Sequence, residues 1–171
     1  DVGGLYEAAA ESIADIAPWM EWSHAAYSFT DAEAWVNAQP AMRKAGDMPL
    51  IVCDASEATV LGSAGVNAVD SLHMRCNLGY WIRTSASGRG LAVRAARLSA
   101  IYAFEEMRLV RAEIVIDIEN RRSVRVAEKL GATYEGVARH RLFHHGAPHD
   151  AHVFSLTRDD LPGLLADRRS A

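Results

Sequence analysis

The segment Ser87-Gly88-Arg89-Gly90-Leu91-Ala92 has the composition of a turn that can hold an anion. It follows a β-type run that ends at Ile82 and precedes an amphipathic helical pattern. Glycines let the backbone approach a ligand closely, and the free amides of a first helical turn carry partial positive charge. The segment is therefore predicted to hold a phosphate or pyrophosphate without a metal, with a plain structural turn as the alternative.

This segment departs from two common phosphate-binding patterns. No Gly-Lys-Ser or Gly-Lys-Thr follows it, as a P-loop requires. The dinucleotide-binding fingerprint needs a parallel strand–helix–strand unit, whereas the strands before this segment read as antiparallel. Neither of these two nucleotide-binding classes is indicated.

A second candidate segment is Asn120-Arg121-Arg122-Ser123, where a predicted strand leads into a helix. Asn120 has the residue type of an N-cap, and Ser123 then lies in the first helical turn. The same placement puts a carboxamide and a hydroxyl beside any ligand that reaches this junction. The capping role and the ligand-binding role are compatible.

The elements that must position these segments read as two helices, three strands, a helix, a strand, a helix and two strands. One strand–helix–strand crossover lies inside a mixed sheet, which predicts an α+β or α/β fold rather than a doubly wound one. The expected ranges are a helix from Tyr6 to Pro18, a helix capped by Thr30 or Asp31 and ending near Gly46, strands at Leu50–Cys53, Val60–Val69 and Asn77–Ile82 joined across Ala55–Thr59 and Asp70–Arg75, a helix at Gly90–Met107, a strand at Arg111–Ile116, a helix at Arg121–Leu130, strands at Thr133–Phe143 and His152–Leu156, and a capping box at Thr157–Asp160 that opens a last helix.

The composition is that of an ordered globular protein. The chain has 171 residues, of which 50% are apolar and 23% are charged, and we expect one domain over residues 1–171. A net charge of −4 argues against a broad basic face for nucleic acid. Two cysteines, Cys53 and Cys76, cannot form a dense disulfide framework, and no signal peptide or membrane span is recognisable. We expect a soluble cytoplasmic protein, with a segment missing before Asp1 because the chain does not begin with Met.

Several segments in order resemble the GNAT acyl-CoA-dependent N-acyltransferases, and specifically the RimJ/RimL branch, the N-terminal acetyltransferases of ribosomal proteins and their relatives. The resemblance spans nearly the whole chain, and the co-occurrence of its segments is more specific than any one of them. A first strand usually precedes the first helix in this family, in line with a missing N-terminal segment. The segments are Asn77–Ile82, the Gly88–Ala92 turn, Tyr102–Glu106, Asn120 with Ser123 before Glu128–Gly131, Pro18–Trp22, Glu135-Gly136 with Arg139, and Asp150–Leu161.

The resemblance implies a three-layer GNAT-like fold, with a mixed, mostly antiparallel sheet, a splayed pair of central strands and flanking helices. Acetyl-CoA, the implied acyl donor, would lie between the strands at Trp81-Ile82-Arg83 and Arg111–Ile116. Its pyrophosphate would bind the amides of Gly88 to Ala92, with Ser87, Arg89 and Leu91 in the same turn. Asn120 and Ser123 would lie near the pantetheine and the sulfur, and Ser123 is the expected proton donor to the departing thiolate.

The sequence differs from the family pattern at two positions. The turn commonly begins with Gln or Arg, where this chain has Ser87, and we expect weaker rather than abolished binding because amides supply most of the anion binding. An acidic residue is common where this chain has Asn77. The general base is therefore not identified by the resemblance.

The remaining candidates have simpler interpretations. His140, His144, His145, His149 and His152 lie with Asp150 in an expected hairpin, where spacing of four is not a zinc signature, so we expect a solvated turn and no metal. One of these histidines could accept a proton near neutral pH. Trp19, Trp22 and Trp35 read as packing residues or as the wall of an acceptor pocket. Glu21, Asp117 and Glu119 read as surface or strand-end acids, although Glu21 could meet a cationic acceptor.

These observations together predict transfer of an acetyl group from acetyl-CoA to a primary amine by direct attack, with a protein or peptide N-terminal α-amine as the expected acceptor. The alternatives are a non-catalytic acyl-CoA-binding module and acetylation of a small polyamine or antibiotic. No membrane or nucleic-acid partner is expected, and the chain could be a monomer or a homodimer.

Overall fold

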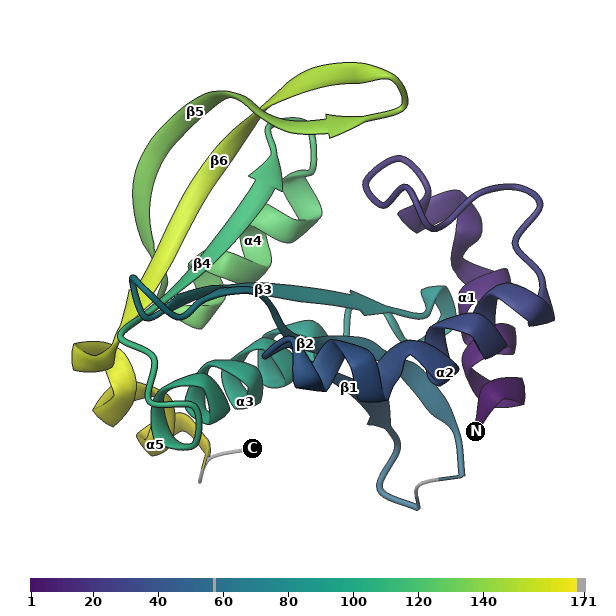
Figure 1. Ribbon diagram of the computed structural model, residues 1–171, viewed down its shortest axis with the longest axis horizontal. Coiled ribbons are helices and arrows are strands. Elements are labelled where there is room, and N and C mark those ends of the chain that lie inside the picture. The colour runs from purple at the N-terminus through teal and green to yellow at the C-terminus, as the bar shows by residue number, and fades with distance from the viewer. Residues whose placement is uncertain (57, 169–171) are drawn as a thin grey trace.

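The computed structural model describes residues 1–56 and 58–168, so Glu57 in the expected Ala55–Thr59 connection and residues 169–171 of the expected domain lie outside it. The order of elements agrees with the sequence-based expectation (Figure 1). The elements are α1 (Val2–Ile16), α2 (Phe29–Lys44), β1 (Met48–Cys53), β2 (Val60–Asp70), β3 (Arg75–Ile82), the 3-10 helix η1 (Thr84–Ala86), α3 (Leu91–Glu105), β4 (Arg111–Asp117), α4 (Arg121–Leu130), β5 (Thr133–His144), β6 (Ala147–Thr157), η2 (Arg158–Asp160) and α5 (Leu161–Arg168).

The strands form one open sheet in the order β1-β2-β3-β4-β6-β5. All neighbours are antiparallel except β3 and β4, which pair in parallel only from Arg75–Asn77 to Arg111–Glu113. Beyond this short register β3 continues to Ile82 and β4 to Asp117, and the two strands diverge (Figure 1). We call this divergence the fork. The expected mixed, mostly antiparallel sheet with a splayed central pair is confirmed.

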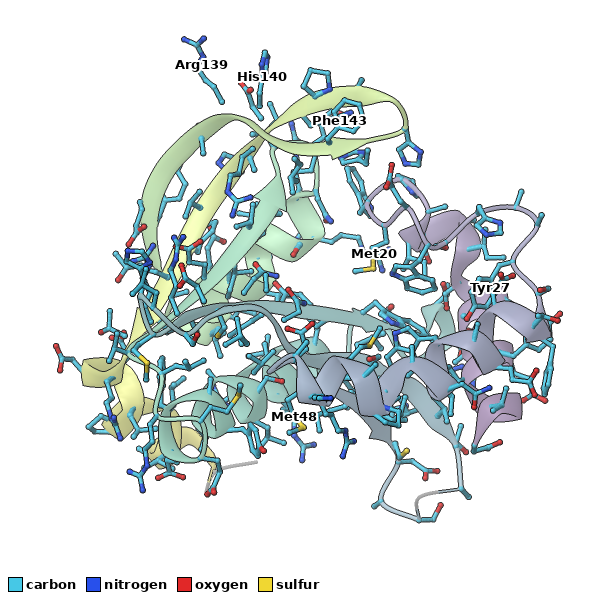
Figure 2. The ribbon with its side chains drawn as sticks, in the orientation of Figure 1. Met20, Tyr27, Met48, Arg139, His140 and Phe143 are labelled. Atoms are coloured by element: carbon cyan, nitrogen blue, oxygen red, sulfur yellow. The ribbon has the colours of Figure 1, made fainter. Side chains whose placement is uncertain are left out.

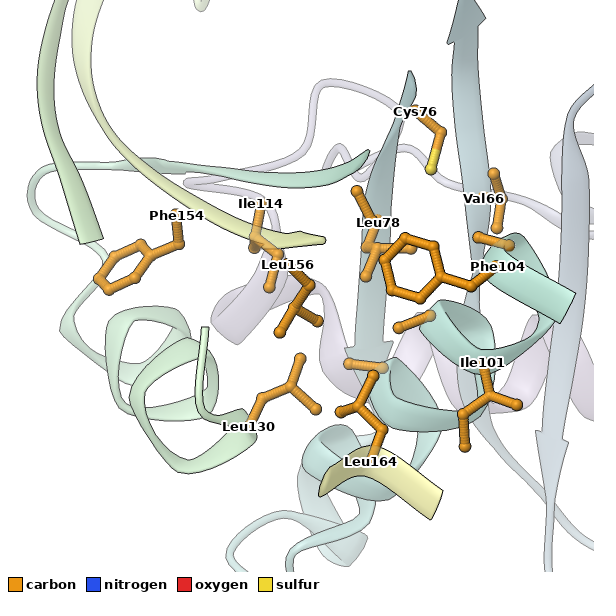
Figure 3. Close-up of a cluster of buried hydrophobic side chains, with 14 of the residues drawn as sticks. Val66, Cys76, Leu78, Ile101, Phe104, Ile114, Leu130, Phe154, Leu156 and Leu164 are labelled. Carbon is orange, nitrogen blue, oxygen red and sulfur yellow. The ribbon is translucent and has the colours of Figure 1, made fainter. Parts of the chain in front are cut away.

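The main hydrophobic core lies where α3, α4 and α5 pack on the sheet (Figure 3). Phe104 of α3 is fully buried and shares this core with Leu78 of β3. Ile114 of β4 and Leu156 of β6 extend the same core beyond the fork. Because one core supports strands on both sides of the fork, the two diverging strands are held in fixed positions. Loss of a buried ring such as Phe104 typically costs about 3–5 kcal/mol of stability.

The start of α2 differs from the expectation. The N-cap is Ser28 rather than Thr30 or Asp31, and Asp31 is the third helical residue. The backbone N–H and the hydroxyl of Ser28 both donate to Asp31 Oδ2, at 2.8 and 2.7 Å. The Asp31 side chain thus reaches back to the N-cap as in a capping box, and it stabilises the helix start from inside the helix.

The last hairpin is longer than expected, because β6 begins at Ala147 and not at His152. The turn consists of His145 and Gly146, which have φ values of 52° and 75°. Two central residues with positive φ match the twist of a two-residue hairpin. His149 and Asp150 are therefore strand residues. Among the helices of the described residues, none has the length and apolar character needed to cross a bilayer.

Candidate active site

A cavity of about 670 Å³ lies between the fork, the start of α4 and the segment that connects α1 to α2. This volume is within the usual range for a small-molecule site. Of the residues predicted for the site, Trp81, Asn120 and Ser123 line the cavity. The other lining residues used below are Trp19, Met20, Trp22, Tyr27, Asp31, Trp35, Asp47, Asn67, Asn77 and Tyr80.

Asn77 lies at the base of the fork, on the last residue of β3 that pairs with β4. Its Oδ1 accepts the backbone N–H of Val115 at 3.4 Å, and its Nδ2 donates to Asn67 Oδ1 at 3.0 Å. The Asn77 amide thus bridges β2 and β4 where the main-chain pairing of β3 and β4 ends. A carboxamide does not ionise near neutral pH, so this position supplies hydrogen bonds and no base.

The start of α4 places a hydroxyl pair at the cavity. Asn120 Oδ1 accepts the backbone N–H of Ser123 at 3.0 Å, as an N-cap does. The Tyr80 hydroxyl lies 3.0 Å from Ser123 Oγ. Burial raises the pKa of Tyr80 to about 12, so its phenol stays protonated near neutral pH. Asn120 therefore caps the helix and lines the cavity at once, and Ser123 has a neutral hydroxyl as its partner.

The glycine turn begins α3, as expected. Gly88 and Gly90 have φ values of 79° and 77°, a region that L side chains rarely adopt, and Gly90 is the N-cap. A Cβ built on either glycine meets no described atom within 4 Å, so the turn faces open space. The helical bonds begin with Arg94 N–H donating to Gly90 O at 3.1 Å, which leaves the preceding amides of the first turn for a ligand.

This turn is held in place by acidic side chains of α1, which the sequence analysis missed. Glu11 Oε1 accepts the backbone N–H of Ser85 at 2.7 Å, and Asp15 Oδ2 accepts the Thr84 hydroxyl at 2.6 Å. Asp15 also pairs with Arg122 of α4 at 3.0 Å. The pKa of Glu11 is lowered to about 2, chiefly by its hydrogen bond from the Arg83 guanidinium and next by the bond from the Ser85 N–H. The contacts join residues about 70 or more positions apart, so no local pattern could have indicated them.

Not every predicted cofactor residue lines the cavity. Ile82, Arg83 and the Ser87–Ala92 turn lie beyond its lining. The Arg83 side chain pairs with Glu11 and donates from Nη1 to the Val60 carbonyl at 3.2 Å. Its guanidinium therefore fixes α1 to the sheet. The side chain of Ser87 donates to the Arg83 carbonyl at 3.3 Å, so it too has a local structural contact.

The end of the cavity beside the segment that connects α1 to α2 is lined by aromatic side chains. Trp22 lies against Trp81 and Tyr27, with ring centroids 5.5 and 5.7 Å apart, and Trp22 is 40% exposed. Met20, from the same connecting segment, lies below the β5–β6 hairpin in Figure 2, and Tyr27 lies beside the segment that joins α1 to α2. Trp19 and Trp35 also line the cavity, which supports the reading of these tryptophans as a pocket wall. Asp31 and Asp47 add carboxylates to the cavity lining, Asp31 in the first turn of α2 and Asp47 just before Met48, which pairs with Val66 of β2.

The histidines of the hairpin differ from the expected solvated turn. His144 is buried, because it lies against Asp117 at the end of β4, and Asp117 is itself only 4% exposed. The strand-end placement of Asp117 was expected, but its burial was not. His140 instead points away from the body of the protein, beside Arg139 (Figure 2). His145 Nε2 lies 3.0 Å from the Ala17 carbonyl, which connects the hairpin tip to the end of α1.

Comparisons with known proteins agree with this architecture. The chain is similar to the Bacillus subtilis protein named "Putative ribosomal N-acetyltransferase YdaF", with 32% identity over 107 residues that cover 63% of this chain and 58% of that protein. It is also similar to spermidine N(1)-acetyltransferase of Escherichia coli K12, with 31% identity over 97 residues, 57% of this chain and 50% of that protein. The matches thus span 50–58% of the length of these two relatives.

Among solved structures, the fold matches RimL, a ribosomal L7/L12 alpha-N-protein acetyltransferase in complex with coenzyme A, with a TM-score of 0.79. The match covers 91% of this chain and 88% of that chain at 20% identity, and so speaks for the fold. The family model described as the acetyltransferase (GNAT) domain matches residues 1–133. Together with the fork, the glycine turn and the ribosomal N-acetyltransferase relative, which fits the RimJ/RimL-type branch, this match shows that the chain belongs to the GNAT acetyltransferase family.

Proposed function

We propose that the protein transfers an acetyl group from acetyl-CoA to a primary amine, with the N-terminal α-amine of a peptide or protein as the acceptor. The observation that carries this proposal is the fork, where two central strands part beside the first turn of α4 and leave a cavity that also opens toward an aromatic wall. A donor can enter from one side of this cavity and an acceptor from the other.

In this proposal acetyl-CoA binds with its pyrophosphate on the amides that follow Gly88 and with its pantetheine in the fork. The first-turn amides of α3 present partial positive charge, and Gly90 leaves room for close approach. Trp81 of β3 and Asn120 at the start of α4 line the cavity that the pantetheine would enter. Beyond Asn77 the strands β3 and β4 no longer pair, and in this proposal backbone N–H groups of β3 that face the fork stabilise the oxyanion that forms.

The acceptor amine must attack as the neutral species. Its nitrogen adds to the acetyl carbonyl carbon, the C–S bond then breaks, and the nitrogen loses a proton to the surroundings. At pH 7 an α-amine with a pKa of about 7.7–8.0 is roughly 10–15% neutral, whereas a lysine amine near 10.4 is about 0.04% neutral. The gap of roughly 2.5 units corresponds to about 3.4 kcal/mol. Asn77 supplies no carboxylate at the base of the fork, and the α-amine is the acceptor that depends least on a base among the lining residues His24, Asp31 and Asp47.

The departing thiolate needs a proton, and Ser123 is the proposed donor. Its hydroxyl lies 3.0 Å from the hydroxyl of Tyr80, which remains protonated near neutral pH. As the C–S bond breaks, Ser123 passes its proton to the sulfur and Tyr80 passes its phenol proton to Ser123 Oγ, and the Tyr80 phenolate then regains a proton from water. A group that acts only as the bond breaks affects turnover more than binding.

Release of coenzyme A in the presence of an acceptor panel tests this proposal. The panel contains a peptide with a free α-amine and no lysine, the same peptide with a blocked N-terminus and one lysine, and spermidine. We expect the first peptide to give the highest kcat/KM at pH 7. Binding of acetyl-CoA without coenzyme A release for any amine would favour the non-catalytic binding module.

A small polyamine is the second candidate acceptor. Asp31 and Asp47 line the same cavity as Trp22 and Tyr27, and carboxylates beside aromatic faces attract cationic groups. The similarity to a spermidine acetyltransferase gives this candidate its support. Spermidine as the best acceptor in the panel, with a loss of at least about tenfold in kcat/KM on Asp47→Asn, would establish it in place of the α-amine.

A further inference from the structure

Three side chains converge outside the cavity where β4 ends and the hairpin turns. Asp117 is the last residue of β4, His144 is the last residue of β5, and His149 lies near the start of β6. His144 Nε2 lies 3.1 Å and His149 Nδ1 lies 3.0 Å from the same oxygen, Asp117 Oδ2. One ligand atom from each of the three residues lies within 4.8 Å of the others. None of the three lines the cavity of the proposed transfer reaction.

The carboxylate at the centre of this cluster is already oriented. Asp117 Oδ1 accepts the backbone N–H of Glu119 at 2.9 Å, which leaves Oδ2 directed at the two imidazoles. Asp117 and His144 are 4% and 6% exposed, so packing fixes both residues. A second hydrogen bond that holds a carboxylate ligand in place is a regular feature of metal sites.

We propose that Asp117, His144 and His149 bind one divalent transition-metal ion, with zinc as the physiological class. Two imidazole nitrogens and one carboxylate oxygen suit zinc or cobalt better than magnesium or calcium, which prefer oxygen ligands. Zinc–ligand bonds of about 2.0–2.1 Å place tetrahedral ligand atoms about 3.3–3.4 Å apart. The two N–O distances in the cluster, 3.1 and 3.0 Å, are close to this spacing.

One of the two imidazole rings must rotate before both can bind the same ion. The imidazoles of His144 and His149 are stacked, with centroids 3.8 Å apart and planes at 20°. Since a metal lies in the plane of each imidazole that binds it, one ring must turn to direct its nitrogen at a shared ion. The side chain of His149 is 33% exposed and is the ring with room to turn. Its exposed side also admits water to the fourth coordination position.

The position of the cluster indicates a structural role for the ion. It would join β4, β5 and β6 at the tip of the hairpin, where His145 contacts the Ala17 carbonyl. Trp19 and Met20 follow Ala17 and line the cavity, so the ion would hold the hairpin beside the aromatic end. Histidine spacing within the hairpin gave no zinc signature because the third ligand, Asp117, comes from a strand that ends 27 residues before His144.

Metal binding by tag-free, chelator-treated protein tests the proposal without any assay of activity. We expect one zinc ion per chain in a calorimetric titration. Zinc at 100 times its dissociation constant should raise the unfolding temperature by about 5–10 °C for a chain of this size. Cobalt in the same site should give the absorption bands of a four-coordinate complex, and magnesium should give neither signal.

Two variants and one control decide the result. His149→Ala removes a part-exposed ligand and should abolish the zinc-dependent shift while the protein remains folded. Asp117→Asn should do the same, but it alters a buried group, so its folding must be checked by circular dichroism. His140→Ala removes an outward-pointing histidine of the same hairpin and should leave binding unchanged. No saturable zinc binding, or binding that survives His149→Ala, would overturn the site and leave the three residues as a hydrogen-bonded cluster.

Discussion

The proposed donor-binding and acceptor-binding ends of the site are built in different ways. The donor end is formed by one short segment, since the two glycines and the first turn of α3 are contiguous in sequence and present their amides together. The acceptor end is assembled from distant parts, because Trp22 of the α1–α2 segment packs on Trp81 of β3 and the hairpin reaches Ala17 through His145. A ligand contact made by backbone amides can be recognised from a short motif. A pocket wall made by side chains from several elements cannot.

This difference has a functional counterpart within the family. A site made of amides binds the feature that every acyl-CoA shares, its pyrophosphate. A wall made of side chains can change with few substitutions, and different relatives are named for ribosomal proteins and for spermidine. Variants at the donor end should therefore affect all acceptors equally, and variants at the acceptor end should change their ranking.

The largest effect is expected from Gly90→Val at the donor end. Gly90 has a φ of 77°, and the added side chain would occupy the space through which an anion approaches. At saturating acetyl-CoA the wild type should gain about 5–10 °C in unfolding temperature, and the variant should gain almost nothing. Differential scanning fluorimetry measures both values.

Gly131→Val is the matched control for this variant. Gly131 ends α4 with a φ of 83° and also has no described atom within 4 Å of an added Cβ. Both variants carry a left-handed strain of the order of 1–3 kcal/mol, but only Gly90→Val blocks the turn. A full acetyl-CoA shift in Gly90→Val would place the pyrophosphate elsewhere.

A smaller effect, on turnover, is expected from variants of the cavity residues Tyr80, Asn120 and Ser123. Ser123→Ala should lower kcat by about 100-fold while the dissociation constant for acetyl-CoA changes by less than about threefold. Tyr80→Phe should lower kcat by about tenfold, since it removes the hydrogen bond to Ser123 and keeps the ring. Asn120→Ala should weaken both binding and turnover, because it also removes the cap of α4. Equal, small losses from all three variants would reduce Ser123 and Asn120 to structural roles.

At the acceptor end, the pH dependence of the reaction tests the absence of a protein base. With subsaturating peptide the rate should rise with pH and level off near the pKa of the α-amine, about 7.7–8.0. The same profile is expected for His140→Ala, because His140 points away from the body of the protein (Figure 2). A plateau near pH 6.5 that disappears in a histidine variant would show that the protein supplies the base.

The smallest expected effect is on stability, from the contacts of Glu11 with Arg83 and Ser85 that hold the donor end against α1. The pKa of Glu11 is lowered to about 2 by Arg83 and by the Ser85 N–H. A carboxyl with a lowered folded-state pKa stabilises the protein above its unfolded-state value, 4.5, and this contribution is lost as the pH falls toward 2. The difference in unfolding temperature between wild type and Glu11→Gln should therefore shrink between pH 4.5 and 2. The exposed Glu7→Gln serves as control, and a constant difference down to pH 2 would contradict the lowered pKa.

Most of the fold was predictable from the sequence because its signals are local. Hydrophobic periodicity located α3 and α4, and glycines marked where helices begin or end, as at Gly90 and Gly131. The errors in element boundaries arose at polar segments whose residue types are common in loops. β6 was expected to begin at His152 because His149 and Asp150 look like loop residues, yet β6 begins at Ala147 and His149 pairs with Leu142.

In the candidate site, too, the features formed by sequence neighbours were predictable and those formed by distant residues were not. The glycine turn and the Asn120–Ser123 junction were recognisable because their residues are neighbours in sequence. Other contacts of the site join residues far apart in the chain. Glu11 and Asp15 of α1 bind η1, and Tyr80 pairs with Ser123. Asp117 is likewise buried against His144, a residue of a later strand. Side-chain chemistry alone could not indicate which partners the fold would bring to these positions.

The most direct test of the central claim is to locate the acetyl group on an acceptor that offers both kinds of amine. A peptide with a free N-terminus and one internal lysine is incubated with the protein and acetyl-CoA at pH 7, and tandem mass spectrometry assigns the modified nitrogen. The proposed mechanism predicts acetyl on the α-amine, with the lysine unmodified at early times, and loss of the product with Ser123→Ala. Acetyl on the lysine, in wild type but not in Ser123→Ala, would show that the site activates a strongly basic amine and would contradict a site without a protein base.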